Sequence, residues 1–284
     1  MRQPELQGIL AGGVGGSRFV LGARRAYPDA EITVVGNTAD DVTLNTLVQG
    51  ALADASATEL GATAVKAAVE RAGVAGEDVD RIYMGCVLPA GLGQAPARQA
   101  ALHAGLPKST EAVTINKMCG SGMKAAMLAH DQLLAGGVDI IVAGGMESMT
   151  NAPYLIPKAR GGLRMGHSEI LDHMFFDGLQ SPFDGKMMGT FADATSAKYG
   201  FTRQQQDEFA AESVRRALAA VEGAGFNSEI APVTVKDRKG ERVVAKDETP
   251  FTCDISKIPN LKPAFGKDGT VTAASSSSIS DGAA

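Results

Sequence analysis

One cysteine of the sequence has neighbours that suit nucleophilic chemistry. Cys119 lies in the sequence MCGSG, residues 118–122, between an expected strand at 112–116 and an expected helix at 121–134. The partial positive charge of a helix N-terminus favours a thiolate, and small neighbouring residues leave the sulfur open to attack a carbonyl carbon. Because free cysteines are mostly buried and inert, a structural role for Cys119 stays open on these residues alone.

The other residues of nucleophilic or metal-binding type are weaker candidates. Cys86 follows an expected strand and Cys253 lies in a loop with proline and threonine, so we expect both to be unreactive. The four histidines are spread over two expected helices and one irregular region (His103, His130, His167 and His173). No two of these side chains have the spacing of a zinc site, and the wide cysteine spacings predict no disulfide framework. We therefore expect no metal ion.

A glycine loop near the N-terminus is a candidate phosphate-binding loop. It follows an apolar segment at 8–11, precedes an expected helix at 17–25 and contains four glycines (Gly12, Gly13, Gly15 and Gly16). Glycines at the start of a helix leave N–H groups free to bind an anion. The pattern is not the dinucleotide fingerprint, because Arg18 stands where the third glycine would be. It predicts phosphate binding without specifying a nucleotide.

The composition excludes several classes of protein. The chain has 284 residues, a formal net charge of −5, 44% hydrophobic and 21% charged residues, which is ordinary for a globular protein that buries a core. The negative charge argues against nucleic acid or an anionic membrane as a partner. The sequence contains no apolar run of about 18 residues and no signal-peptide core. We therefore expect a cytoplasmic enzyme.

The secondary-structure pattern must position these residues. Three strands are expected at 81–85, 112–116 and 139–143, and they alternate with helices at 57–73, 96–104 and 121–134. This alternation predicts a mostly parallel sheet with helices on both faces. Residues 150–200 break the rhythm with prolines and glycines, which indicates a functional insertion. The remaining expectations are a helix at 203–222, a hairpin at 233–246, a last strand at 271–272 and the opening of a helix at 281–284.

Five motifs together resemble the thiolase family. Besides residues 118–122, they are GGMESMTNAP at 144–153, MGT at 188–190, KPAF at 262–265 and GTVTA at 269–273. The resemblance covers residues 48–284. It implies an α/β, thiolase-like layered fold with a mixed five-stranded sheet, helices on both faces and an inserted loop domain at 150–228. It also implies that the family's C-terminal half-molecule is absent, so we expect a truncated chain.

Site residues follow from this resemblance, position by position. Cys119 matches the nucleophile that takes the acyl group from acyl-CoA, and its backbone N–H matches one oxyanion-hole donor. Met188 matches a methionine that lines the acyl pocket, for which core packing is an equal alternative, and Ser277 matches a serine that contacts the pantetheine arm. The resemblance implies acyl-CoA substrates, no cofactor beyond the coenzyme A thioester as substrate, fatty acid metabolism, and a homodimer or tetramer.

The first residues do not fit the thiolase pattern. Residues 7–45 resemble the N-terminus of the 2-phospholactate transferase family, in which the glycine loop faces phosphate. We therefore divide the chain into segments 1–47 and 48–284. An apolar segment, either 8–11 or 31–35, is expected to replace the absent first strand of the thiolase sheet.

Three functions are consistent with these patterns. The leading hypothesis is a thiolase-type acyltransferase, an acetyl-CoA C-acyltransferase, that condenses or cleaves acyl chains through a cysteine acyl-enzyme. The alternatives are a nucleotide-linked transferase of the phospholactate type and a non-catalytic acyl-CoA-binding half of a thiolase. The sequence contains neither the Gly-His-Pro nor the Cys-x-Gly motif that carries the thiolases' acid–base groups. We therefore expect this chain alone to accept acyl groups slowly and not to complete the condensation.

Overall fold

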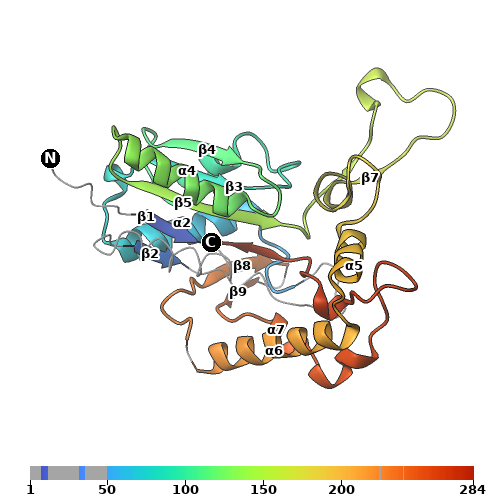
Figure 1. Cartoon of the computed structure of the whole chain (residues 1–284). Helices are drawn as coiled ribbons and strands as arrows, with labels where there is room; N and C mark the ends of the chain where they lie inside the picture. The colour runs from blue at the N-terminus through green and yellow to red at the C-terminus, as the bar shows by residue number, and fades with distance from the viewer. Residues whose placement is uncertain (1–7, 12–31, 36–49, 224, 239) are drawn as a thin grey trace.

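A mixed sheet forms the centre of the molecule. The structure, a computed structural model, describes residues 8–11, 32–35, 50–223, 225–238 and 240–284. Its largest sheet has the strand order β2-β1-β5-β3-β4, and β10 pairs separately with β5. Helix α4 lies on one side of this sheet and α2 on the other, while α6 and the β8–β9 hairpin lie below it as drawn in Figure 1. The α/β layered fold is the one that the sequence predicts.

The strands confirm the predicted positions and add to them. β3 (Arg81–Gly85), β4 (Glu111–Ile115) and β5 (Ile141–Ser148) are parallel, with β3 in the middle. β1 (Gly8–Ala11) pairs with the other side of β5, and β2 (Ile32–Val35) pairs with β1, both in parallel. The sheet has six strands where five were expected, because both apolar segments of the front region join it. The glycine loop and the helix expected at 17–25 lie outside the described residues.

Three helices cover the two faces of the sheet: α2 (Ala57–Ala72), α3 (Pro96–His103) and α4 (Ser121–Ala135). Successive residues of β5 point to opposite faces. Val142 and Met146 therefore pack in one core cluster with α2 and α3, whereas Ile141 and Ala143 pack in another with α4. This two-sided burial explains why β5 is apolar without interruption at its start.

The first covering helix begins and ends as its sequence predicts. Ser56 caps α2 in a capping box with Glu59, whose carboxylate accepts the Ser56 N–H over 2.8 Å. The helix ends at Gly73, which has a φ of 65° in the left-handed region that favours glycine. Local capping signals therefore set both bounds of α2.

The insertion after β5 consists of short elements. They are β6 (Tyr154–Leu155), the 3-10 helix η2 (Ala159–Gly161), β7 (Leu171–Asp172), the π-helix η3 (Met174–Leu179) and α5 (Met188–Tyr199). The chain between β6 and β7 extends away from the body as an arm (Figure 1). The following elements are α6 (Arg203–Glu222), β8 (Val233–Asp237), β9 (Gly240–Val244), α7 (Thr249–Thr252) and η4 (Ile255–Asn260).

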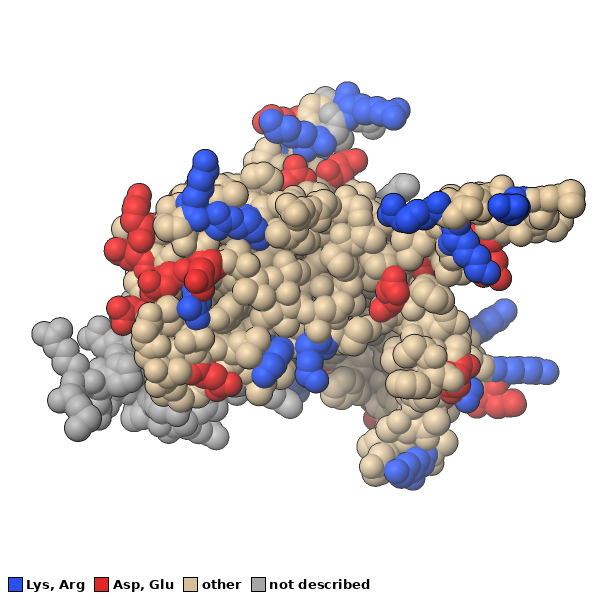
Figure 2. Space-filling view, turned by 90° about the horizontal axis from the view of Figure 1, so that it is seen from above, with Lys and Arg blue, Asp and Glu red and all other residues tan. Residues whose placement is uncertain are grey.

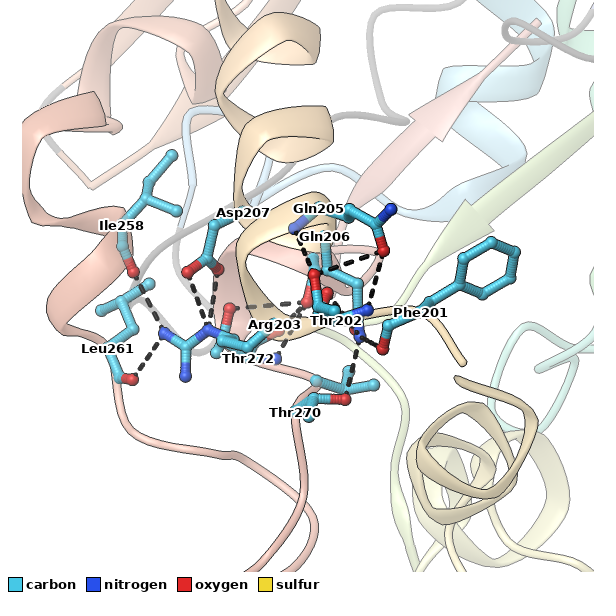
Figure 3. Close-up of polar contacts among 12 residues, drawn as sticks. Phe201, Thr202, Arg203, Gln205, Gln206, Asp207, Ile258, Leu261, Thr270 and Thr272 are labelled. Carbon is cyan, nitrogen blue, oxygen red and sulfur yellow. Dashed lines mark hydrogen bonds and ion pairs between the residues drawn. The ribbon is translucent and has the colours of Figure 1, made fainter. Parts of the chain in front are cut away.

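The start of α6 anchors the chain that follows the hairpin, as Figure 3 shows. Arg203 Nε lies 2.9 and 2.8 Å from the two carboxylate oxygens of Asp207, which is buried. One terminal nitrogen of the same guanidinium donates to the carbonyls of Ile258 and Leu261 over 3.2 and 2.8 Å. A buried carboxylate needs a partner, and Arg203 is the partner of Asp207. The same guanidinium holds residues 258–261 on α6, so the pair plays a structural role.

The C-terminal part of the chain corrects two predictions. Residues 271–272 are buried but are followed by the 3-10 helix η5 (Ala273–Ser275), and they do not form the predicted strand. The predicted opening of a helix is instead the strand β10 (Asp281–Ala283), which is antiparallel to β5. The sequence Asp-Gly-Ala contains no β-branched residue, so its local propensity did not indicate a strand. Pairing with Met146–Ser148 provides the hydrogen bonds that decide its conformation.

Candidate active site

Three segments that carry candidate residues meet at one edge of the sheet. The register pairs Gly85 at the end of β3 with Ile115 of β4 and with Gly145 of β5. The chain continues from β3 into Cys86 and from β4 into the turn that holds Cys119. The carboxyl edge of parallel strands is where α/β proteins commonly place their ligands. Both thiols therefore lie at the edge where a functional site is expected.

Cys119 lies in a tight turn directly before α4. The thiol-bearing residue is exposed, and Gly120 is the N-cap of the helix. Met118 has a φ of 50°, which residues other than glycine rarely adopt. The Oγ of Ser121 accepts the Lys117 N–H over 2.9 Å and donates to the Met118 carbonyl over 2.6 Å. The result is an accessible thiol at a helix N-terminus, as the MCGSG motif predicts.

Glycines allow α4 to approach the strands closely at this point. A Cβ on Gly85 would lie 2.7 Å from the backbone nitrogen of Gly122 and from Ser121, which is closer than real side chains come. On the next strand, a Cβ on Gly145 would lie 3.6 Å from the Gly122 Cα. The start of the GGMESMTNAP motif therefore packs against the residues that follow Cys119. The glycines thus fix the position of the turn through close backbone packing.

Cys86 has the opposite environment. It is 1% exposed, and its Sγ lies 3.6 Å from Oε1 of Glu147. Burial, reinforced by the Glu147 carboxylate, raises the pKa of the Cys86 thiol to about 12. This value supports the expectation that Cys86 is unreactive. For Cys253, partial burial and the neighbouring Asp254 also raise the pKa of the thiol.

Glu147 holds the segment that follows β3. Its two carboxylate oxygens accept the N–H groups of Val87 and Leu88 over 2.8 and 2.9 Å. Burial raises the pKa of Glu147, although these two backbone hydrogen bonds oppose the shift. The Glu147 side chain therefore holds residues 87 and 88 in place, which is a structural role.

The rest of that motif joins β5 to β10 and to the chain before α2. The Asp281 carboxylate accepts the Thr150 N–H over 3.0 Å and the Thr150 hydroxyl over 2.6 Å. The buried Ser148 hydroxyl donates to the Ala55 carbonyl over 3.1 Å, and the Asn151 amide donates to Ser148 Oγ over 2.9 Å. These bonds make the motif a scaffold for the carboxyl edge of β5.

The histidines are not placed as a group. His173 is buried, its Nδ1 lies 2.6 Å from Asp177, and its Nε2 accepts the Ala90 N–H over 3.4 Å. His167 is exposed in the arm between β6 and β7. With both ring nitrogens of His173 engaged, the geometry supports a structural role for it.

Met188 and Ser277 belong to segments other than the cysteine turn. Met188 is the first residue of α5 and is 44% exposed. A Cβ on the next residue, Gly189, would overlap the Phe265 ring, so α5 packs against the KPAF motif there. Ser277 is exposed between η5 and β10. Their roles toward a substrate stay predictions.

Asn116 is a residue of this edge to which the sequence assigns no role. Its Oδ1 accepts the Met118 N–H over 3.0 Å, and its Nδ2 donates to the Val87 carbonyl over 3.3 Å. An asparagine that follows a strand and binds the backbone two residues later forms an Asx-turn. That placement was a signal available in the sequence, but the contact with Val87 depends on the tertiary structure.

Among the helices in the described part of the chain, none combines the length and the apolar composition of a membrane span. No group of three or more histidine, cysteine, aspartate or glutamate side chains there is arranged to hold a metal ion.

Comparisons with known proteins place these observations in a family. The chain is 48% identical to an acetyl-CoA acetyltransferase of Pseudomonas aeruginosa over 238 residues, which is 83% of this chain and 61% of that protein. It is 45% identical to a mitochondrial acetyl-CoA acetyltransferase of Gibberella zeae over 279 residues, which is 96% of this chain and 64% of that protein. The chain therefore spans less than two thirds of the length of these relatives.

The fold comparison agrees with the sequence comparison. The crystal structure of the Acat5 thiolase from Ascaris suum in complex with coenzyme A superposes with a TM-score of 0.77 at 38% identity, covering 87% of this chain and 63% of that chain. The thiolase N-terminal domain matches residues 38–284, a range that includes the cysteine turn, the GGMESMTNAP motif and β10. The chain therefore belongs to the thiolase family.

Proposed function

We propose that this chain carries the acyl-accepting part of an acetyl-CoA acetyltransferase. The Cys119 thiolate attacks the carbonyl carbon of an acyl-CoA thioester, the bond from that carbon to the coenzyme A sulfur breaks, and the released coenzyme A thiolate takes up a proton from water. The single observation that carries the proposal is the exposed Cys119 in a glycine-lined turn before α4. The acetyl-CoA acetyltransferase relatives and the coenzyme A complex of a related thiolase support it.

The residues around the thiol take the roles that the family implies. The Cys119 N–H donates to the thioester carbonyl oxygen as negative charge develops there, Met188 lines the acyl pocket, and Ser277 contacts the pantetheine arm. Coenzyme A thioester is the substrate, and no separate cofactor is needed. The groups that would move the α-proton are not in this sequence, which lacks the Gly-His-Pro and Cys-x-Gly motifs. We therefore assign acyl capture, rather than condensation, to these residues.

The test is acyl transfer to the protein itself. The chain is incubated with acetyl-CoA, digested, and examined by mass spectrometry for an acetylated peptide. We expect one acetyl group on Cys119, none on Cys86 or Cys253, and no adduct in Cys119→Ser. The matched control, Cys253→Ser, should acetylate like the wild type. A wild-type chain that binds coenzyme A without any adduct would support the non-catalytic alternative instead.

The proposed assembly is a homodimer through β4 and α4. β4 is the last strand in the order of the described sheet, so its outer edge can pair with another strand. Val113 on β4 and Met123 and Met127 on α4 are exposed apolar residues. Figure 2 shows a broad uncharged surface on the side of the molecule that holds these elements, with charged residues mostly at its rim. Light scattering of wild type and Met127→Glu tests this, and a wild-type monomer would contradict it.

A second candidate activity concerns the front segment. β1 and β2 are adjacent and parallel, and in the sequence the four glycines follow the carboxyl end of β1. This topology favours phosphate binding by Gly12, Gly13, Gly15 and Gly16, which lie outside the described residues. The resemblance of residues 7–45 to 2-phospholactate transferases is a second argument for this activity. Calorimetry with a guanosine nucleotide should show binding that Gly13→Asp removes.

We place the protein in the cytoplasm, which fractionation of cells can test.

A further inference from the structure

A continuous series of hydrogen bonds links the GGMESMTNAP motif to the cysteine turn. Glu147 accepts the Val87 N–H over 2.8 Å. The carbonyl oxygen of Val87 accepts a hydrogen bond from Asn116 Nδ2 over 3.3 Å. Asn116 Oδ1 in turn accepts the Met118 N–H over 3.0 Å. The series thus begins on β5, crosses the segment after β3, and ends on the residue before Cys119.

The end of this series is the strained residue of the turn. Met118 has a φ of 50°, and a non-glycine residue in this region costs free energy that the surroundings must offset. Its N–H is held by Asn116 and its carbonyl by the Ser121 hydroxyl, at 3.0 and 2.6 Å. Both sides of the strained backbone are therefore held by side chains. Loss of either contact lets Met118 relax, and the position of the next residue, Cys119, changes with it.

We propose that Asn116 and Glu147 are positioning residues for Cys119, which act by holding Met118 in its left-handed conformation. Asn116 acts directly on the turn, and Glu147 acts through the Val87 carbonyl. The proposal rests on the proposed function, in which Cys119 must face a thioester carbonyl. Small displacements of a reacting group have large effects on rate, so residues that touch no substrate can still control acyl capture.

The first experiment compares two asparagines of similar bonding. Asn116→Ala removes the contacts to Val87 and Met118, whereas Asn151→Ala removes contacts to Ser148 and to the carbonyls of Ala53 and Ala55. We expect Asn116→Ala to slow acetylation of Cys119 about tenfold, with Asn151→Ala within about twofold of wild type. Glu147→Gln, which can accept only one of its two N–H bonds, should slow it roughly threefold. Equal effects of both asparagine variants would overturn the proposal.

The second experiment tests the conformational cause. Glycine adopts a positive φ without strain, so Met118→Gly should restore most of the rate lost in Asn116→Ala when both changes are combined. A double variant as slow as Asn116→Ala alone would contradict the proposal. A merely structural role for Asn116 would show no such rescue.

Thiol labelling separates this proposal from the proposed function. The same variants are labelled with iodoacetamide, which needs no acyl chemistry. If the wild-type Cys119 is alkylated but never acetylated, the proposed function fails. The positioning proposal is then tested by alkylation alone. It is supported if Met118→Gly restores the alkylation rate that Asn116→Ala lowers, and contradicted if the rate stays low.

Discussion

The ends of β3 and β4 are neighbours in one sheet but give their cysteines opposite surroundings. Cys86 directly follows β3, is 1% exposed, and lies against the Glu147 carboxylate. Cys119 follows β4 by a short turn, is exposed, and directly precedes a helix. The strands bring both sulfurs to one edge of the sheet, so the edge alone does not select the nucleophile.

The chain beyond each strand makes the difference. After β3 the backbone passes beside β5, where Glu147 binds Val87 and Leu88 and encloses the Cys86 thiol. After β4 the backbone turns at Met118 and enters α4, whose N-cap Gly120 has no side chain to cap the helix. Burial beside a carboxylate disfavours a thiolate at Cys86, whereas the exposed sulfur of Cys119 is open to a reagent. The reactivity of a thiol at this edge therefore depends on the segment that follows its strand.

The largest expected effect is on alkylation of the two thiols. With a pKa of about 12, Cys86 is about one part in ten thousand thiolate at pH 8. We expect iodoacetamide to label Cys119 at least about a hundredfold faster than Cys86, with rates read from peptide masses over time. Cys119→Ser should remove the fast reaction and leave the slow ones. Equal alkylation rates at Cys86 and Cys119 in the folded protein would contradict the difference in their surroundings.

A smaller effect is expected when the close packing beneath the turn is disturbed. Gly85→Ala places a Cβ 2.7 Å from the backbone of Gly122, which can move only with α4. We expect a loss of up to about 3 kcal/mol in the free energy of unfolding, measured by urea denaturation, and slower labelling of Cys119. Gly161→Ala is the matched control, because no atom lies within 4 Å of the added Cβ. Similar losses in both variants would refute the packing argument.

The smallest expected effect concerns the pH dependence of stability. The pKa of Cys86 is raised from 9.0 to about 12 in the folded chain, so its thiol is largely protonated at pH 8 in both the folded and the unfolded state. As pH rises above 9, the unfolded chain loses the proton first, and stability falls. Between pH 8 and 10.5 the wild type should lose about 2 kcal/mol more than Cys86→Ala. Parallel stability curves for the two proteins would show that Cys86 is not shielded.

Several elements were predictable because their signals are local. The capping box at Ser56 and the left-handed Gly73 bound α2, and a second capping box at Thr202 begins α6. Both depend on residues within one turn of the helix end. The hairpin at 233–246 was also found, with its glycine at the turn. Such signals act within a few residues and do not depend on the tertiary structure.

Other features were hidden because their partners are distant in the sequence. β10 has the composition of a turn or helix start and becomes a strand only through pairing with Met146–Ser148. The six-stranded sheet depends on β1 pairing with β5, although the partners Gly8 and Ile141 are 133 residues apart in the sequence. The role of Asn116 depends on Val87, which belongs to the segment after another strand. No local propensity encodes these contacts.

The amino-acid sequence was enough to single out Cys119 as the candidate nucleophile, through its local pattern together with the thiolase resemblance. Small residues between an apolar strand and a helix place Cys119 at a helix N-terminus in any fold that forms both elements. Only the tertiary structure decided that Cys86 is shielded by Glu147 and that the turn before Cys119 is held from β5 through Val87. The physical reason is that burial and electrostatic environment are sums over neighbours in space, whereas helix and turn signals are sums over neighbours in the chain.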